Sequence, residues 1–550
     1  MNFKQNETAV KLRGGYYTPK PIAIFLSKWV LKKHPRAILE PGCGDGHFIA
    51  ALKGLHKYKI DITGVELLAQ EANKARTVAS ENQLLNTKII NTDFLKWAIE
   101  NFDGNNRFDA VFGNPPYIRY QYLEESDQIL SESIFNRHNL KFTKHTNAWV
   151  PFVIAGIDLL NAGGRLAMVV PSELLHVLHA GSLRKFLVSE CSQITIIDPK
   201  ELLFEEALQG TILLMVEKKH DQNQATKGIA LISVPDTNFL ETDPESIYQN
   251  AKYVSGNILN GKWMKLLLKP AELQLLESIE RLNNVQRFSE LATVDIGIVT
   301  GANNFFLVDN STVEKYGLDE FVKPIFGRSE HCPGIIYDNR LHSLNQANGL
   351  PVNFLMFGDI PFDDLPPKVQ DYIRLGEKEL IHKRYKCRIR TPWYSVPSIY
   401  STRVGMLKRS HQYPRLILNK ANTYTTDTSY RIKPLSITSD KLVFCFLNSL
   451  TALSAELEGR HYGGGVLELV PSEIEKLLIP VPTKIDIDLR KLNQAFLDGK
   501  NSDFILADQD KLILRAIGMN IFDCSTIHNA WQRIRSRRQR IVEQPEFSEE

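Results

Sequence analysis

Residues 37–48 read AILEPGCGDGHF, a short apolar run followed by three alternate glycines and the start of a helical pattern. Gly42, Gly44 and Gly46 have no Cβ atom, so the backbone can turn sharply there and approach a ligand closely. Such a turn is often a purely structural device, and where it binds a ligand it serves phosphates and nucleosides alike. The segment therefore predicts a strand-turn-helix unit and a candidate ligand site, and it leaves the chemistry of the ligand open.

The sequence around this turn alternates short β-branched or apolar runs with longer helical patterns, from about residue 37 to about residue 216. This alternation favours an α/β fold in which helices cover a parallel, Rossmann-like sheet. A polar stretch near residues 236–253 precedes a less regular half, so we expect two domains, residues 1–240 and a mixed α+β domain of residues 241–550. The seven predicted strands are residues 37–40, 60–66, 88–92, 108–113, 165–171, 194–198 and 211–217.

The composition is that of an ordinary globular protein, and it argues against several classes. Apolar residues make up 43% of the 550 residues, and the formal charge of +3 is too small to indicate a polyanionic partner by itself. The six cysteines form no CxxC pair, so we expect neither a metal site nor disulfides. The N-terminal residues lack a signal-peptide core, and Asp158 interrupts the apolar run VPFVIAGIDLL, so we predict a cytoplasmic protein without membrane contact.

Two acidic residues follow the glycine turn at the ends of the next two predicted strands. Glu66 comes 20 residues after Gly46, a separation at which a strand-end carboxylate can accept hydrogen bonds from both hydroxyls of a ribose. Asp93 ends the third predicted strand, where it can accept from the amino group of an adenine while Phe94 packs against the ring. Either acid alone is commonly a solvated strand end. In this order after the turn, they favour a nucleoside ligand such as the adenosine of S-adenosylmethionine.

The fourth predicted strand ends in Asn114-Pro115-Pro116-Tyr117. A Pro-Pro pair is usually a rigid turn, but ligands of doubly wound sheets bind beyond the carboxyl ends of the strands, where this loop is expected to lie. An aromatic amine is a poor nucleophile until its hydrogens are drawn out of the ring plane. The Asn114 side-chain oxygen and the Pro115 carbonyl are suited to accept those hydrogens, with Pro116 stiffening the loop and Tyr117 offering a face to a base.

These motifs together resemble the γ class of adenine-N6 DNA methyltransferases of bacterial restriction–modification systems. The resemblance rests on YYTP at residues 16–19, EPGCGDGHF, Glu66, Asp93-Phe94 and NPPY, and it covers residues 14–217 closely and the remainder loosely. NPPY is shared with methyltransferases that act on RNA or on protein glutamine. The more discriminating element is YYTP before the glycine turn.

The resemblance implies a cofactor, an activity and further site residues. The cofactor would be S-adenosyl-L-methionine, bound at Gly42, Gly44, Glu66, Asp93 and Phe94, with Thr18, Glu40 and Cys43 around its methionine end and Phe152 on its adenine. The implied reaction is direct methyl transfer to N6 of an adenine flipped out of double-stranded DNA, with no metal and no covalent enzyme intermediate. Phe204 would stack on the flipped base. The implied partner beside DNA is a cognate restriction endonuclease, encoded separately.

The second half contains a basic window without acids. Between Leu380 and Thr426 there are ten Lys or Arg residues and no Asp or Glu, which favours a surface that binds phosphate over a merely solvated loop. Residues 298–304 and 461–465 resemble stretches of the target-recognition domains of the same family, although both are also typical of tight turns. The candidate DNA-binding residues are Lys383, Arg384, Lys386, Arg388 and Arg390.

Several alternatives remain beside the adenine-N6 DNA methyltransferase. An RNA or protein-glutamine methyltransferase would use the same loop, whereas a catalytically silent DNA-binding protein would be expected to have lost Asn114, a turn glycine or Glu66. A fused restriction enzyme would need a PD…ExK carboxylate set, and a cytosine-C5 enzyme a Pro-Cys dipeptide, and neither pattern is found. A run of arginines near the C-terminus, at residues 533, 535, 537, 538 and 540, is predicted to be a frayed, charged end.

Overall fold

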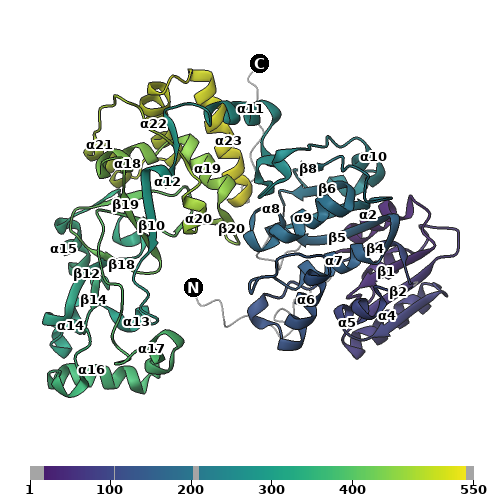
Figure 1. Ribbon diagram of the computed structural model, residues 1–550, viewed down its shortest axis with the longest axis horizontal. Coiled ribbons are helices and arrows are strands. Elements are labelled where there is room, and N and C mark those ends of the chain that lie inside the picture. The colour runs from purple at the N-terminus through teal and green to yellow at the C-terminus, as the bar shows by residue number, and fades with distance from the viewer. Residues whose placement is uncertain (1–17, 105, 202–209, 540–550) are drawn as a thin grey trace. The chain divides into compact units, whose positions relative to one another are not determined.

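The computed structural model describes residues 18–104, 106–201 and 210–539. The chain forms two compact units, which divide between Leu268 and Lys269 (Figure 1). Each unit has its own sheets and its own buried core. The first unit contains the glycine turn and the NPPY loop, and the second contains the basic window.

The first unit is built on an eight-stranded sheet with the order β3-β2-β1-β4-β5-β7-β6-β8. All seven predicted strands are present, so the predicted α/β class is confirmed. An eighth strand, β8, was not predicted; it lies at the edge of the sheet and pairs in parallel with β6. The strands are β1 (Ala37–Pro41), β2 (Asp61–Glu66), β3 (Thr87–Asn91), β4 (Phe108–Gly113), β5 (Leu160–Pro171), β6 (Cys191–Pro199), β7 (Thr211–Lys218) and β8 (Ile229–Val234).

One strand departs from the predicted parallel sheet. β7 runs antiparallel to both of its neighbours, β5 and β6, while the other paired strands of this sheet are parallel. β6 and β7 are consecutive along the chain, and consecutive antiparallel strands need no crossover helix between them. The sheet is therefore Rossmann-like with one reversed strand inserted between β5 and β6.

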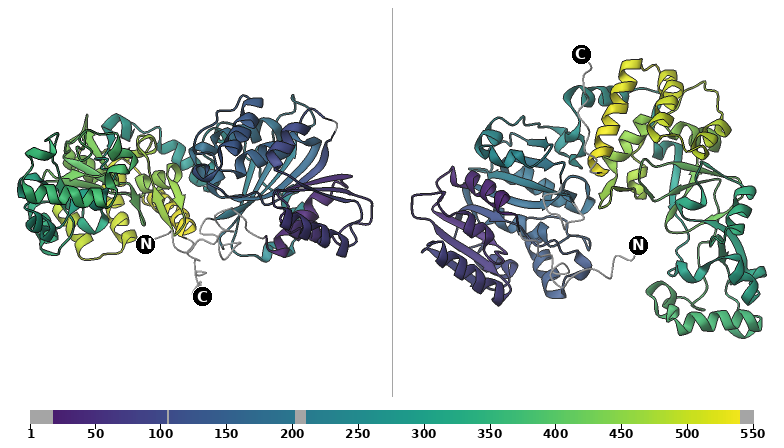
Figure 2. Two further views of the ribbon diagram at one scale, coloured as in Figure 1. Left: turned by 90° about the horizontal axis from the view of Figure 1, so that it is seen from below. Right: turned by 180° about the vertical axis from the view of Figure 1, so that it is seen from behind.

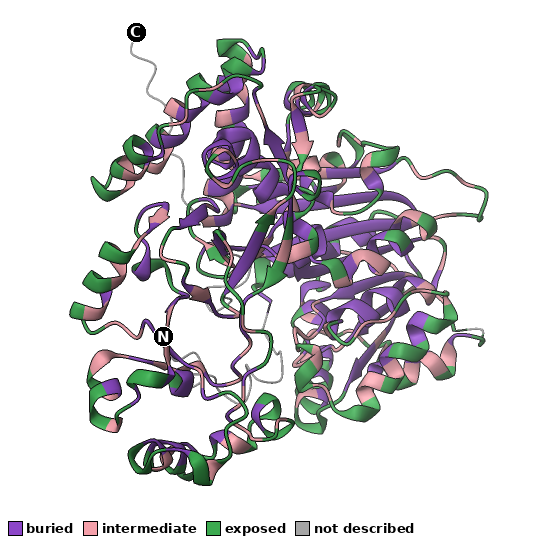
Figure 3. Cartoon of the chain, turned by 60° about the vertical axis from the view of Figure 1, so that its left-hand side comes forward, coloured by how far each residue is buried: buried purple, intermediate pink, exposed green. Residues whose placement is uncertain are grey.

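Two groups of helices pack on the sheet (Figure 2). The first group consists of α2 (Lys20–Leu31), α3 (His47–Ala51), α4 (Ala69–Glu81) and α10 (Pro244–Gln249). In this group α10 contacts α2, α2 contacts α3, and α3 contacts α4. The second group consists of α5 (Phe94–Asn101), α6 (Glu125–Arg137), α7 (Trp149–Asp158) and α9 (Gly181–Glu190). The strands between them are mostly buried, and most of these helices have both buried and exposed residues, whereas α7 is buried along nearly its whole length (Figure 3).

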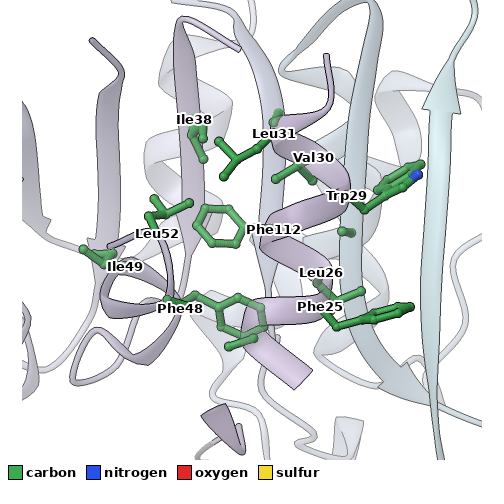
Figure 4. Close-up of a cluster of buried hydrophobic side chains, with 14 of the residues drawn as sticks. Phe25, Leu26, Trp29, Val30, Leu31, Ile38, Phe48, Ile49, Leu52 and Phe112 are labelled. Atoms are coloured by element: carbon green, nitrogen blue, oxygen red, sulfur yellow. The ribbon is translucent and has the colours of Figure 1, made fainter. Parts of the chain in front are cut away.

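The core of this unit holds α2 and the glycine turn against the sheet (Figure 4). Phe48, the last residue of AILEPGCGDGHF, packs edge-on against Phe112 of β4 with ring centroids 5.3 Å apart. Trp29 and Phe25 of α2 are fully buried in the same cluster. The turn is thus anchored by apolar side chains on both its flanks, which holds its backbone in place for a ligand.

Residues beyond 240 complete the first unit. Arg165 of β5 is buried and donates to both carboxylate oxygens of Glu245, at 2.6 and 3.0 Å. Tyr248 packs on Trp29 with ring centroids 4.8 Å apart. Because these contacts bury a charge and two large rings, the segment up to Leu268 belongs to the compact first unit. The predicted boundary at residue 240 concerns function: it separates a cofactor-binding domain from a DNA-recognition domain, and it stays a prediction.

The second unit mixes small sheets with helices. Its sheets have the orders β10-β19-β15-β17-β13, β11-β14-β12-β18, β16-β21-β20 and β22-β9. The strands are β9 (Val285–Arg287), β10 (Ala292–Ile296), β11 (Leu307–Val308), β12 (Val322–Phe326), β13 (Ile336–Tyr337), β14 (Asn353–Leu355), β15 (Val404–Leu407), β16 (Arg409–Ser410), β17 (Leu416–Asn419), β18 (Tyr424–Thr425), β19 (Ser429–Pro434), β20 (Arg460–Tyr462), β21 (Val466–Glu468) and β22 (Leu478–Pro480).

Helices surround these sheets, so the predicted α+β character of the second half is confirmed. Those used below are α11 (Pro270–Ile279), α13 (Asn303–Phe306), α15 (Asn339–Ala347), α16 (Pro367–Lys378), α17 (Tyr385–Arg388), α19 (Ser449–Glu458), α22 (Ser502–Ala516) and α23 (Ile521–Gln539). Within the ranges that the structure describes, we find no helix of a length and apolarity that would let it span a membrane.

The arginine run is part of the folded second unit, and the prediction of a frayed end is wrong for three of its members. Arg533 on α23 pairs with Glu272 of α11, and Arg535 pairs with Asp503 of α22. Arg538 is buried against Glu456 of α19, with nitrogen–oxygen distances of 2.7 to 3.2 Å. Composition alone cannot distinguish a solvated basic run from one whose members pair with acids on other helices. Arg540 lies outside the described residues.

Candidate functional site

The glycine turn between β1 and α3 requires residues without a Cβ atom. Gly42, Gly44 and Gly46 have φ angles of 65°, 52° and 93°, in the left-handed region that other residues rarely adopt. A Cβ on Gly46 would lie 3.1 Å from the Cα of Ala75 on α4, whereas a Cβ on Gly44 would have no described atom within 4 Å. The turn is therefore tight on its α4 side and open at Gly44.

Glu66 lies at the end of β2 and is fixed by the turn itself. Its two carboxylate oxygens accept hydrogen bonds from the backbone N–H of Gly44 and of Leu68, each at 2.9 Å. A carboxylate oxygen can accept more than one hydrogen bond, so both oxygens keep acceptor capacity for a ligand. The structure thus brings Glu66 to the glycine turn, as the sequence spacing predicts.

Glu40 and Cys43 are buried on the β1 side of the turn. Burial, the negative charge of Asp45 and that of Glu66 raise the pKa of Glu40 well above its ordinary value. The Oε2 atom of Glu40 is buried and accepts no hydrogen bond from the residues described here. Burial also raises the pKa of the Cys43 thiol, so the thiol stays neutral. Thr18 is buried two residues before α2 begins.

Two phenylalanines lie together next to the turn. Phe94 of α5 and Phe152 of α7 have ring centroids 4.9 Å apart, and a Cβ on Gly42 would lie 3.5 Å from the Phe152 ring. Asp93 caps α5, and its Oδ1 atom accepts from the backbone N–H of Lys96 at 2.8 Å. The predicted acid and both predicted rings are therefore neighbours in the fold, with one oxygen of Asp93 already used by the helix cap.

The NPPY loop follows β4, which is the sheet neighbour of β1. Gly113 has a φ of 151°, which other residues rarely adopt, and a Cβ there would lie at an ordinary contact distance of 3.6 Å from the Cγ of Glu40. The Oδ1 atom of Asn114 and the Pro115 residue are buried, and Pro116 is half-buried. The Tyr117 hydroxyl donates to the carbonyl of Val169 on β5 at 3.0 Å, which fixes its ring.

Two glycines beside the turn, and one hydrogen-bonded pair beyond the strand ends, were not predicted from the sequence. Gly64 of β2 allows the turn to approach, because a Cβ there would lie 2.9 Å from the Sγ of Cys43. Gly113 is required by its φ of 151°, and a glycine inside a strand is the signal that marks such positions. Asn147 donates to Glu173 at 2.9 Å just beyond the ends of the strands, and no pattern in the sequence singles out that pair. Phe204 lies outside the described residues.

Four of the five predicted DNA-binding residues in the basic window are exposed, and the fifth, Arg390, is partly buried. Lys383, Arg384, Lys386 and Arg388 are exposed on and before α17. Arg390 instead donates to the backbone carbonyls of Val299 and Thr300, at 2.6 and 2.8 Å, and burial lowers its pKa. The four exposed cations are available to a polyanion, while Arg390 holds the protein's own backbone.

The glycine-rich segment at residues 461–465 is a tight turn between β20 and β21. Gly464 and Gly465 have φ angles of 74° and 70°, which only glycine adopts without strain. The Gly465 carbonyl accepts from Arg538, so the hairpin is tied to α23.

Two family models match the sequence. The model of the N-6 DNA Methylase family covers residues 2–247, and that of the C-terminal domain of the Type II methyltransferase M.Eco57I covers residues 260–514. The chain thus carries an N-6 DNA methylase region followed by a region that matches the C-terminal domain of M.Eco57I. It is therefore an S-adenosyl-L-methionine-dependent DNA methyltransferase, and the RNA, protein-glutamine and silent alternatives are not favoured.

Alignments with two curated relatives cover most of this methylase. The Type II methyltransferase M.AccI of Acinetobacter calcoaceticus is 27% identical over 526 residues, which are 90% of this chain and 92% of that protein. M.BstVI of Geobacillus stearothermophilus is 21% identical over 433 residues, 74% of each chain. Among solved structures, the type IIG restriction endonuclease BpuSI has a TM-score of 0.42 at 14% identity, covering 98% of this chain and 68% of that one.

The turn of this N-6 DNA methylase fits S-adenosyl-L-methionine. The cofactor carries an ammonium and a sulfonium group, and a buried carboxylate whose Oε2 accepts nothing from the described residues suits a cation at Glu40. The open space beside Gly44 and the fixed carboxylate of Glu66 suit a ribose. Within the described part of the chain, no three His, Cys, Asp or Glu side chains come together as around a metal ion.

Replacing Glu66 with alanine should weaken S-adenosyl-L-methionine binding by about 1–3 kcal/mol, the cost of leaving polar groups without partners. The measurement is titration calorimetry of the methylase with the cofactor. Glu81→Ala, which removes an exposed acid at the end of α4, is the matched control and should bind as wild type does. An unchanged affinity in Glu66→Ala would remove Glu66 from the cofactor site.

Proposed function

We propose that this methylase transfers a methyl group from S-adenosyl-L-methionine to N6 of an adenine that is flipped out of double-stranded DNA. It would act at a specific DNA sequence as the modification enzyme of a restriction–modification system, in the cytoplasm, beside an endonuclease encoded separately. The observation that carries the proposal is that the NPPY loop follows β4, the sheet neighbour of β1, so that it lies beside the glycine turn. The NPPY loop, which would bind the amine, and the glycine turn, which would bind the cofactor, would thus lie on either side of one reaction centre.

The loop would act on the amine by accepting its hydrogens. The side-chain oxygen of Asn114 and the carbonyl of Pro115 would each accept one N–H bond, so the nitrogen lone pair leaves conjugation with the ring. The two prolines limit the directions that these acceptors can take. The Tyr117 ring, held through its hydroxyl to Val169, would stack on the target base.

The residues around the turn would hold the cofactor. When bound, S-adenosyl-L-methionine supplies an electrophilic methyl group. Glu66 would accept from the ribose hydroxyls, and Glu40 with Thr18 and Cys43 would surround the methionine end. The Asp93 carboxylate and the Phe94 and Phe152 rings would surround the adenine, beside Gly42 and Gly44.

The substrate side needs both phosphate contacts and a way to extrude the base. Flipping a base out of the duplex costs on the order of a few kcal/mol. Stacking, worth about 1–3 kcal/mol per base, would offset much of this cost through Tyr117 and Phe204. The exposed Lys383, Arg384, Lys386 and Arg388 would hold phosphates.

The test is to express the methylase in a host that has no DNA methylation of its own and to sequence the DNA with a method that detects each methylated base. We expect N6-methyladenine at one recognition sequence, and none in cells that express Asn114→Ala. Methylated cytosine, or no methylated base at all with soluble, cofactor-binding protein, would overturn the proposal. A search of the neighbouring genes for an endonuclease that cuts the same, unmethylated sequence would test the partner.

Neutralising Lys383, Arg384, Lys386 and Arg388 together to alanine should weaken binding to every DNA sequence and flatten its salt dependence. The slope of log K against log salt should fall by up to about 0.9 for each lost phosphate contact, about 3.6 in all. Fluorescence anisotropy at several salt concentrations measures both effects, and cofactor affinity should not change.

The matched control neutralises four exposed cations elsewhere in the second unit, namely Lys484, Arg490, Lys500 and Lys511. It removes the same formal charge but lies outside the acid-free window. If both quadruple variants flatten the slope equally, the effect is one of net charge and the window is not the DNA contact.

A further inference from the structure

Two segments that are far apart in the sequence form one surface in the second unit: residues 298–304, and residues 381–390 at the start of the basic window. The short helices α13 and α17 that carry them lie near each other in Figure 1. Gly301 has a φ of 83°, and a Cβ on it would lie only 2.7 Å from the Cβ of Lys386. The two segments can therefore pack this closely only with a glycine at residue 301.

Three side chains of residues 381–390 make polar contacts with residues 298–304. Arg390 donates to the carbonyls of Val299 and Thr300, at 2.6 and 2.8 Å. The Cys387 thiol donates weakly to the Thr300 carbonyl at 3.8 Å. Arg384 donates to the side-chain oxygen of Asn304 at 3.0 Å. The first two contacts are internal and hold the backbone, whereas Arg384 and Asn304 are both exposed.

The neighbouring residues Asn303 and Asn304 differ in their hydrogen-bond partners. Asn303 is engaged inside the protein: its oxygen accepts from the Thr300 hydroxyl at 2.5 Å, and its nitrogen donates to Asp427 at 3.1 Å. Asn304 contacts only Arg384 among the hydrogen bonds within the described chain, and it faces outward. A structural role accounts for Asn303 and leaves Asn304 unexplained.

Asn304 stands on a rigid support. The residue after it, Phe305, is buried and stacks on Tyr372 of α16, with centroids 4.7 Å apart and planes 26° apart. The Tyr372 hydroxyl donates to the carbonyl of Phe305 at 2.7 Å. A side chain that reads a base must be held in position by such packing.

The chemistry of the pair selects what it can bind. Phosphate contacts orient a protein on DNA without reading sequence, whereas Asn and Arg side chains in the major groove read base edges. Because the Asn304 oxygen accepts from Arg384, the pair presents mainly N–H donors outward. Guanine offers two acceptors, O6 and N7, on its major-groove edge and so matches a donor pair.

We propose that Asn304, oriented by Arg384, is a specificity-determining residue that reads a guanine in the recognition sequence. Lys383, Lys386 and Arg388 flank the pair and hold phosphates, and Arg384, which uses one N–H group on Asn304, keeps its other N–H groups for a phosphate. Gly301 positions the basic window next to Asn304. This inference rests on the proposed function, since it presupposes that the second unit contacts DNA.

The experiment uses the full-length methylase and the recognition sequence found by sequencing. Single-turnover methylation is measured on duplexes in which each base pair of that sequence is replaced in turn. With Asn304→Ala, discrimination at one G·C pair should fall roughly 5- to 100-fold and stay unchanged at the other positions. The slope of log K against log salt should match that of wild type, because no phosphate contact is lost.

The control and a second variant separate the possible outcomes. Asn348→Ala removes another exposed asparagine, at the end of α15, and should discriminate as wild type does at every position. Gly301→Ala should displace Lys386 and weaken binding to all sequences alike. If Asn304→Ala keeps wild-type discrimination at every position, or weakens all sequences equally, the inference is wrong while the proposed function stands. If wild type methylates no adenine, the proposed function fails and the inference falls with it.

Discussion

Replacing Asn114 with alanine is expected to lower the rate of methyl transfer by at least about 100-fold, the usual cost of removing a preorganised polar contact from a reaction centre. The Asn114 side-chain oxygen is buried at the end of β4, where Gly113 lies beside Glu40. A water molecule that replaced the amide would not be held in the same direction. Cofactor binding should be nearly intact, because the lost acceptor serves the amine and not the sulfonium.

The measurement is a single-turnover assay with radiolabelled cofactor, beside calorimetry of cofactor binding to the same protein. Asn223→Ala, which removes an exposed asparagine in the loop between β7 and β8, is the control and should react as wild type does. Retention of more than about a tenth of the wild-type rate in Asn114→Ala would contradict the role given to this loop.

Replacing Arg538 with alanine should destabilise the second unit by about 3–5 kcal/mol, the typical effect of leaving one member of a buried ion pair without its partner. Glu456 is buried and accepts three hydrogen bonds from the Arg538 guanidinium, which also donates to the carbonyls of Gly465 and His411. Removing the guanidinium would therefore strand a buried carboxylate and release the hairpin β20–β21.

The pH dependence of this contribution has a definite sign. The positive charge of Arg538, together with hydrogen bonds from Arg538 and His461, lowers the pKa of Glu456 from 4.5 to about 2, against the effect of its burial. A carboxyl whose pKa is lowered by folding stabilises the native state above its unfolded pKa and loses that effect as the pH falls toward the folded value. The difference in stability between wild type and Arg538→Ala should thus be full above about pH 4.5 and shrink toward pH 2.

Urea unfolding together with hydrogen exchange of α19 and α23 would measure the effect of Arg538→Ala and locate it. Lys511→Ala, an exposed cation on α22, is the matched control and should unfold at the wild-type urea concentration. A double variant with Glu456→Leu and Arg538→Met should recover much of the lost stability, because no charge then remains buried. If Arg538→Ala unfolds as wild type does, the ion pair does not hold α23 in place.

The sequence predicted the first unit well because its signals are local. The runs that became β1 to β7 are continuous and β-branched, and the glycine turn and NPPY lie directly at strand ends. The reversed direction of β7 has no such signal, since a fully buried strand reads the same in either orientation. Gly64 was missed because its importance comes from a neighbour that is distant in the sequence, Cys43.

The second unit was less predictable because its important contacts are long-range. The composition of the basic window was apparent from the sequence. It could not distinguish the exposed Arg384 from Arg390, whose guanidinium donates to a backbone carbonyl 90 residues earlier in the chain. The arginines of α23 were predicted to be solvated, but three of them pair with acids on other helices. Their acidic partners, such as Glu272, lie up to 261 positions earlier in the chain.

The ion pair of Arg533 with Glu272 joins the last helix of the second unit to its first, and the two helices lie side by side in Figures 1 and 2. During synthesis a chain emerges from the ribosome N-terminus first, and domains fold as units. All the described strands of the first unit have been synthesised once Val234 has emerged. The second unit, in contrast, needs its last helix, α23, which ends at Gln539. Its start and end are thus adjacent, an arrangement that lets a domain be exchanged as one block between proteins. A chain that ends before residue 538 would thus have a complete first unit, whereas its second unit would lack the buried contact of Arg538 with Glu456.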